Sequence, residues 1–232
     1  MRRFRWLGLV VWLAWFAAQP RAEAVILINE VLADPPAAGG DANGDGLISS
    51  TQDEFVELVN TGTGSVSLAG WTLSDAVQVR HVFSSSASIP ASGFFVLFGG
   101  GSPQGFANAA VASSGSLSLN NAGDTVTVRD ANALFVDALT YGAEGGTDVS
   151  LTRSPDAIGL FVKHSAVNTA RFSPGATVDG LASLGSPGPP LDGPAELPDP
   201  GGVPAIPEPA SLILLGVGLL GFPVARREET HF

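Results

Sequence analysis

The sequence predicts an all-β protein built as an antiparallel β-sandwich. Its apolar residues fall into short runs, and turns rich in glycine, asparagine, aspartate and serine separate these runs. Outside two terminal segments, no long window shows the period of an amphipathic helix. The chain of 232 residues contains no cysteine, so its hydrophobic core has to hold the fold without disulfides.

The segments that carry the strand pattern are residues 25–32, 55–59, 65–68, 70–73, 94–98, 124–129 and 134–140. The run at 94–98 is apolar throughout and predicts a central strand, whereas 124–129 alternates as a half-buried strand does. Trp71 is expected to anchor the core, because large aromatic side chains dominate small sandwich cores.

The chain after Gly142 is expected to stay partly ordered. Residues 149–155 predict an edge strand that Pro155 ends, and Phe161 and Phe172 are expected to cap the sandwich. The domain is therefore placed at 25–185. Residues 186–206 are rich in proline and glycine and predict an extended linker.

The N-terminus has the pattern of a secretory signal peptide at residues 1–24. Arg2, Arg3 and Arg5 precede an apolar run at 6–18, and small residues stand around Ala24 at the predicted cleavage site of signal peptidase. An N-terminal membrane anchor is the alternative, but a spanning helix needs about 20 apolar residues.

The C-terminus predicts a second sorting segment at 207–232. Pro207, Glu208 and Pro209 precede an uncharged run at 210–225, and Arg226-Arg227 closes it. A helix of that length reaches about 24 Å, short of a hydrocarbon core of about 30 Å. This transmembrane run therefore suits transient recognition better than permanent anchorage. A plain membrane anchor stays the alternative.

The order Pro-Glu-Pro, apolar run, Arg-Arg resembles the PEP-CTERM sorting signal. The resemblance implies a Gram-negative cell envelope and processing near Pro207–Pro209 by an exosortase. It also implies membrane contact through the C-terminal segment before processing. The matrix partners that it implies are an exopolysaccharide or matrix proteins.

Composition excludes one class of partner. Lysine and arginine number 11 against 22 aspartates and glutamates, which gives a net charge of −11. A chain this acidic is repelled by phosphate backbones, so no nucleic acid is expected to bind.

Several blocks in the middle of the chain closely resemble the lamin tail domain family. They are Ile28-Asn29-Glu30-Val31-Leu32, Glu54-Phe55-Val56-Glu57-Leu58-Val59-Asn60, Gly70-Trp71-Thr72-Leu73-Ser74-Asp75, Asn121-Ala122-Gly123-Asp124 and Tyr141-Gly142. The resemblance implies an immunoglobulin-like sandwich. It also implies that Glu30, Glu54 and Glu57 lie beside strands and accept hydrogen bonds from turns. They are not expected to form a catalytic pair.

An insertion at 41–53 predicts a calcium loop. Asp41, Asn43 and Asp45 place oxygen ligands at positions 1, 3 and 5, and the carbonyl of Leu47 stands at position 7. The pattern resembles an EF-hand or dockerin-type loop. It departs at position 12, which is Gln52 where an acid is expected, and Asp53 or Glu54 would substitute only if the loop gains a residue. A solvated turn is the alternative. Ile48 is expected to tie the loop to the core.

The other candidate residues predict no chemistry. His81 and His164 stand outside any ligand pattern and are expected at the surface or at strand edges. The run at 99–101 is expected to be a flexible glycine loop, because no nucleotide-binding motif follows it.

The leading interpretation is an exported, exosortase-sorted, non-catalytic binding or adhesion module of the cell envelope or extracellular matrix. A calcium-dependent hydrolase of phosphoesters or glycans, using Asp41 and Asp45, is one alternative. A structural surface protein that self-associates through strand edges is the other.

Overall fold

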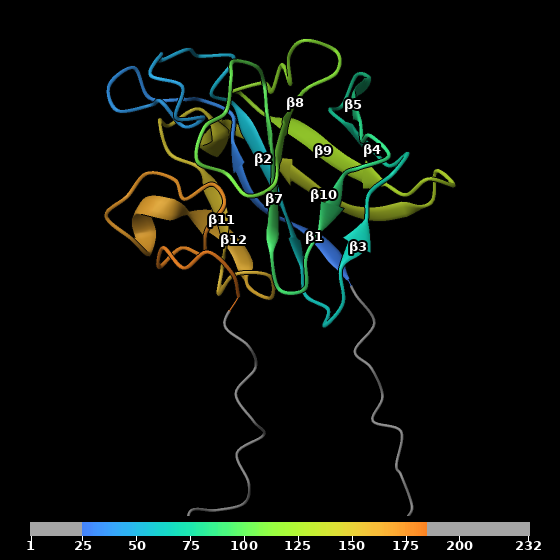
Figure 1. Cartoon of the computed structure of the whole chain (residues 1–232). Helices are drawn as coiled ribbons and strands as arrows, with labels where there is room; N and C mark the ends of the chain where they lie inside the picture. The colour runs from blue at the N-terminus through green and yellow to red at the C-terminus, as the bar shows by residue number, and fades with distance from the viewer. Residues whose placement is uncertain (1–24, 185–232) are drawn as a thin grey trace, which may run out of the picture. The chain divides into compact units, whose positions relative to one another are not determined.

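The computed structural model describes residues 25–184 and places them in a β-sandwich (Figure 1). The larger sheet has six strands in the order β12-β11-β1-β2-β7-β8, and the smaller has four in the order β10-β9-β4-β5. Strands β3 and β6 form a short separate pair. Only β7 and β8 pair in parallel; the other pairs of the described residues are antiparallel.

The strands are β1 Ile26–Leu32, β2 Phe55–Asn60, β3 Val66–Ser67, β4 Thr72–Ser74, β5 Val79–Val82, β6 Ser88–Ile89, β7 Phe94–Phe98, β8 Ala109–Val111, β9 Asp124–Arg129, β10 Phe135–Tyr141, β11 Leu151–Ser154 and β12 Leu160–Lys163. Two short 3-10 turns accompany them, η1 at Ala143–Gly145 and η2 at His164–Ala166. The described residues outside these elements are turns and loops.

The main core lies between the two sheets. Leu58 of β2 and Leu97 of β7 meet Leu73 of β4 and Val128 of β9, and all four are fully buried. Trp71 is half-buried and packs against this cluster, as a core anchor should. Burying a side chain of this size stabilises the fold by about 1.5–3 kcal/mol.

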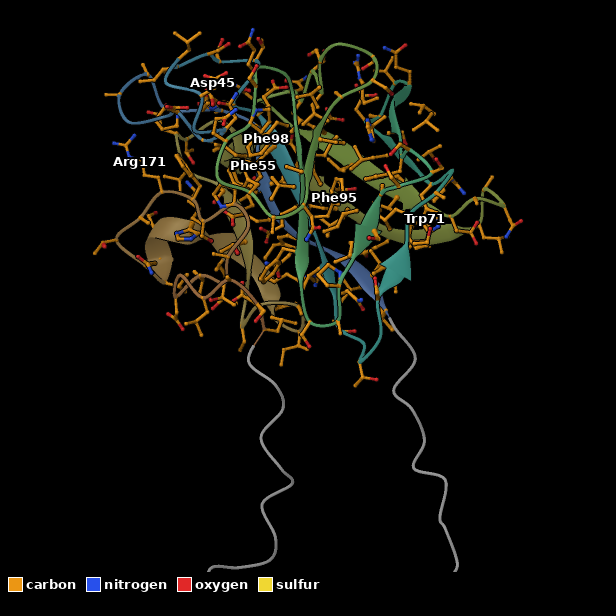
Figure 2. The ribbon with its side chains drawn as sticks, viewed as in Figure 1. Asp45, Phe55, Trp71, Phe95, Phe98 and Arg171 are labelled. Atoms are coloured by element: carbon orange, nitrogen blue, oxygen red, sulfur yellow. The ribbon has the colours of Figure 1, made fainter. Side chains whose placement is uncertain are left out.

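The larger sheet is also covered on its outer face. Phe55 of β2 and Phe98 of β7 lie edge to face with ring centroids 5.9 Å apart, and Phe172 packs on Phe55 at 6.3 Å (Figure 2). Val59 and Phe94 meet Ala157 on the same face. Because both faces of β2 and β7 are buried, these strands are apolar at consecutive positions instead of alternating.

The sequence located most of the sandwich correctly. The strands predicted at 25–32, 55–59, 94–98, 124–129 and 134–140 are confirmed, with ends that shift by a residue or two. The strands predicted at 65–68 and 70–73 are shorter. Strands β5, β6, β8 and β12 were not predicted, because each is short or lacks a clear alternating pattern.

Two predictions about the chain after Gly142 are wrong. The strand predicted at the sheet edge, β11, lies inside the sheet, because β12 pairs with its other side. Phe172 covers the outer face of the larger sheet and does not cap the sandwich core, whereas Phe161 does pack against that core.

The predicted signal peptide at 1–24, the linker at 186–206 and the sorting segment at 207–232 with its transmembrane run lie outside the described residues. Within residues 25–184, no helix is long and apolar enough to cross a membrane.

Ending the chain at Gly142 is expected to abolish cooperative unfolding. The shorter chain loses β11, which pairs with β1, and loses Phe172, which covers Phe55. Both losses uncover the outer face of the larger sheet, where Phe55 is fully buried in the intact domain. Thermal unfolding followed by circular dichroism would compare it with a chain that ends at Leu184. Equal melting midpoints for the two chains would contradict the prediction.

Candidate functional site

The acidic loop at residues 41–53 lies between β1 and β2 and is closed by Asp53. The buried carboxylate of Asp53 accepts the backbone N–H groups of Asn43 at 3.0 Å and Ser49 at 2.7 Å. Ile48 is 50% exposed, so the expectation that it ties the loop to the core is wrong. The buried carboxylate of Asp53, which accepts two backbone amides, holds the loop in place instead.

The predicted ligands Asp41 and Asn43 lie together. Both accept the amide N–H of Asp45, at 3.1 Å and 3.0 Å. Asp45 accepts the amides of Leu47 at 2.9 Å and Ser102 at 3.0 Å (Figure 2). The bond from Ser102 is the main reason why the pKa of Asp45 is lowered, so this carboxyl is ionised at neutral pH.

The glycine run at 99–101 packs against the acidic loop. Gly101 has a left-handed backbone with φ of +76°, and a Cβ there would stand 2.3 Å from Nδ2 of Asn43 and 2.5 Å from Oδ2 of Asp45. Asn43 Nδ2 also donates to the carbonyl of Gly100 at 3.3 Å. The run therefore allows a close approach of two loops, and its interpretation as a free flexible loop is wrong.

The donor set fits calcium in type, since aspartate and asparagine oxygens suit a hard cation. However, fewer of these oxygens face a common centre than the sequence spacing predicts. The oxygens of Asp45 and Asp53 face backbone amides. Among residues 25–184, no three histidine, cysteine or acidic side chains gather closely enough to hold a metal. Calcium binding at Asp41, Asn43, Asp45, Leu47 and Asp53 stays a prediction.

A second polar site is fully buried on the outer face of the larger sheet. Glu30 of β1 and Glu57 of β2 are register partners, and neither has solvent contact. Glu30 accepts hydrogen bonds from the hydroxyl of Ser150, the amide of Ser173 at 3.0 Å and the hydroxyl of Ser173 at 2.9 Å. The donors all come from the chain after β10.

Glu57 has its own donors. Nδ2 of Asn29 donates to Oε1 at 2.8 Å, and the amide of Gly175 donates to Oε2 at 2.6 Å. Asp156 lies beside this pair, since it also accepts a hydrogen bond from Nδ2 of Asn29 at 3.1 Å. The amide of Val178 donates to the same carboxylate at 3.2 Å. Three acidic side chains thus share one network of donors.

Burial favours the protonated form of both glutamates. It raises the pKa of Glu30 to about 7 and the pKa of Glu57 well above its ordinary value, with the charge of Glu30 adding to the second shift. Removing a carboxylate from water disfavours the charged form, and a second carboxylate nearby disfavours it further.

His164 completes this network as a neutral ring. Burial lowers its pKa. Nδ1 lies 2.9 Å from the carbonyl of Ala170 and therefore carries the proton. Nε2 lies 3.0 Å from Oγ of Ser173. The same hydroxyl donates to Oε2 of Glu30 at 2.9 Å, so Ser173 links His164 to the glutamate.

The histidines are not at the surface, although His81 does lie on β5, the edge strand of the smaller sheet, as the alternative expectation has it. His164 is fully buried and His81 is 6% exposed. No periodicity could have revealed this, because both rings are held by groups of irregular loops. The amide of Ser113, for example, donates to Nδ1 of His81 at 3.1 Å.

The expectation that the three glutamates accept hydrogen bonds from turns and loops is confirmed. Glu54 is 4% exposed and accepts the amide of Leu119 at 3.3 Å. Its burial raises its pKa to about 7. One of its carboxyl oxygens is thus engaged by a residue outside the acidic loop. Like Glu30 and Glu57, it accepts bonds from loops.

Comparison with known proteins agrees with this architecture. The model of the Lamin Tail Domain family matches residues 19–143, more than half of the chain, and the chain belongs to that family. The model of the PEP-CTERM protein-sorting motif matches residues 205–227 and indicates export and exosortase sorting. No curated protein matches the chain. The family match ends before β11, so Ser150, His164, Ser173 and Gly175 lie beyond it.

The stability of the protein is expected to fall as pH rises from about 5 to 7. The unfolded chain releases the proton of Glu30 near its ordinary pKa of 4.5, whereas the folded chain keeps it until about 7. The free energy of unfolding therefore decreases by about 1.4 kcal/mol per pH unit for each such carboxyl. The lowered pKa values of His81 and His164 act in the opposite direction below about 6.5.

Comparing Glu30→Gln with the unchanged chain tests the carboxyl together with the network around it, because the contribution of His81, which lies outside this network, cancels in the difference. Between pH 5 and 7, the free energy of unfolding from urea titrations should fall with pH less steeply in the variant than in the unchanged chain. The difference should be about 1.4 kcal/mol per pH unit, the contribution of one proton. Glu144→Gln is the control, since Glu144 is exposed. If the free energy of unfolding depends on pH equally in Glu30→Gln and in the unchanged chain, the raised pKa of Glu30 is refuted.

Calcium is expected to raise the melting temperature if the acidic loop binds it. At 100-fold excess over Kd a ligand stabilises by about 2.7 kcal/mol, which corresponds to about 5–10 °C for a domain of this size. Calorimetry with calcium against chelator measures this, and Asp45→Ala should remove the increase. Asp130→Ala is the matched control, since Asp130 also accepts two turn amides. An unchanged melting curve would rule out the site.

Proposed function

We propose that this member of the Lamin Tail Domain family is a non-catalytic adhesion module of the cell envelope or extracellular matrix. Two findings support the proposal. The sorting motif at 205–227 directs the chain out of the cell. The matched domain at 19–143 is a sandwich of a family that is immunoglobulin-like, an architecture that presents loops and sheet edges for binding.

The observation that carries the non-catalytic part is the burial of the three glutamates. Glu30, Glu54 and Glu57 are 0%, 4% and 0% exposed, and groups of the fold occupy their oxygens. A general acid or base has to reach its substrate directly or through one water. These carboxyls serve the fold instead.

Self-association is a second candidate, because the outermost strand of the larger sheet is open. Strand β12 ends the sheet, and Leu160 at its start is 83% exposed, next to Ile158 at 81%. An unpaired strand edge with exposed apolar side chains is a template for pairing with another chain.

The purified full chain is expected to bind matrix isolated from the organism that produces it. The measurement is co-sedimentation with the matrix, with a cysteine-free protein of similar charge as the control. Retention in the matrix fraction at low protein concentration supports adhesion. A light-scattering mass that grows with concentration, together with no retention, would replace adhesion by self-association. Turnover of glycans or phosphoesters by the same sample would overturn the non-catalytic assignment.

A further inference from the structure

A pocket opens at one end of the sandwich, between the edge strand of the smaller sheet and the last two strands of the larger sheet. Its cavity is about 460 Å³, within the range of about 300–1,000 Å³ of small-molecule sites. Its lining includes His81, Ser84, Ser86, Phe95, Asn108 and Ser113. We call it the β5–β8 pocket.

The lining of the β5–β8 pocket is polar without being charged. Among the described residues that line it, none is an aspartate, glutamate, lysine or arginine. His81 is the one titratable group there. Burial lowers its pKa, with the carbonyl of Val111 acting weakly in the opposite direction, so the ring is neutral at pH 7. In a chain of net charge −11, this lining is a distinctive neutral surface.

Part of the wall is held rigidly by the fold. The hydroxyl of Ser113 accepts the amide of Val82 at 3.1 Å, and the amide of Ser113 donates to Nδ1 of His81. Nδ2 of Asn108 donates to the carbonyl of Phe94 at 3.2 Å. These bonds fix the side chains before any ligand arrives, which lowers the entropic cost of binding.

Other groups of the wall are available to a ligand. Asn108 keeps its Oδ1 as an acceptor, since no donor to it is found among residues 25–184. The hydroxyls of Ser84 and Ser86 lie 3.1 Å apart on an exposed turn. Each hydroxyl both donates and accepts. The pocket therefore offers several neutral hydrogen-bonding groups within one ligand's reach.

The base of the pocket is apolar. Phe95 lies on β7 (Figure 2), edge to face with Phe83 at 5.4 Å, and Phe83 packs on His81 at 4.6 Å. Ala87, Ala109 and Ala110 complete the wall with small side chains. Such a surface accepts the C–H face of a ring, while the hydroxyl and amide groups around it bind the polar edge.

We propose that the β5–β8 pocket binds one or two residues of an uncharged glycan chain. This inference rests on the proposed adhesion to matrix and names the ligand class. Phosphate or a uronic acid finds no cationic partner in this lining, and a metal ion finds no carboxylate. A lipid chain would bury the serine hydroxyls without partners, which costs free energy. A ring that carries both hydroxyl groups and C–H faces satisfies every part of the lining.

The test is titration of the purified full chain with neutral oligosaccharides, namely cello-, xylo- and dextran-derived series, and with an acidic oligouronate. The Ser84→Ala, Ser86→Ala double variant removes two hydroxyls and should weaken binding about ten-fold, since each neutral hydrogen bond contributes about 0.5–1.5 kcal/mol. Ser86→Trp should block the mouth and abolish binding. Both positions are exposed, so the fold tolerates the changes, and melting curves check this.

The matched control is the Ser116→Ala, Ser118→Ala variant, because those two hydroxyls form a similar exposed pair, 2.9 Å apart, outside the pocket. It should bind like the unchanged chain. Binding of none of the neutral series, preference for the oligouronate, or equal affinity in all three variants would overturn the pocket assignment. If Ser86→Trp still adheres to isolated matrix, adhesion stands and the pocket assignment fails. If the unchanged chain does not adhere, the proposed function itself fails.

Discussion

Two glutamates face each other across the central strands β1 and β2 without solvent contact, and the outer half of the domain is arranged around them. A buried polar group without partners costs free energy, and a buried charge costs far more. The donors that prevent this cost include Ser150, Ser173 and Gly175, which lie beyond the family match. The chain after β10 is therefore a required part of this domain, since it supplies hydrogen bonds that the sandwich strands need.

The same segment explains the unusual composition of the central strands. Phe55 and Phe98 point to the outer face, which Phe172 and Phe106 cover. A sandwich whose outer face met water would alternate apolar and polar residues in β2 and β7. Covering both faces instead yields runs of consecutive apolar residues, with one polar interruption at Glu57. That interruption is stable because the covering segment carries amide and hydroxyl donors as well as aromatic rings.

How much the sequence could predict depends on the range of the interactions. Strands such as 94–98 and 124–129 were predicted because side-chain alternation and turn residues are local signals. The burial of His164 was not predicted, because its partners Ala170 and Ser173 lie in a loop without periodicity. The close approach of Gly101 to Asn43 was missed for the same reason, since the two residues belong to loops from different parts of the chain. In the acidic loop, the Asp-x-Asn-x-Asp spacing predicts oxygen ligands for a calcium ion. The structure uses the same oxygens to accept amides, and both uses require the same residue types.

The distribution of charge connects the fold to the proposed role. Some acidic side chains accept hydrogen bonds inside the domain, as Glu30 does, and others accept amides at turns, as Asp45 and Asp130 do. Adhesion by opposite charge would weaken with ionic strength outside the cell, because exposed charges are screened over about 8–10 Å at physiological salt. Neutral hydrogen bonds and ring contacts depend little on salt. For a protein of net charge −11 in the proposed adhesive role, an uncharged contact surface is the more effective one, and the β5–β8 pocket has an uncharged lining.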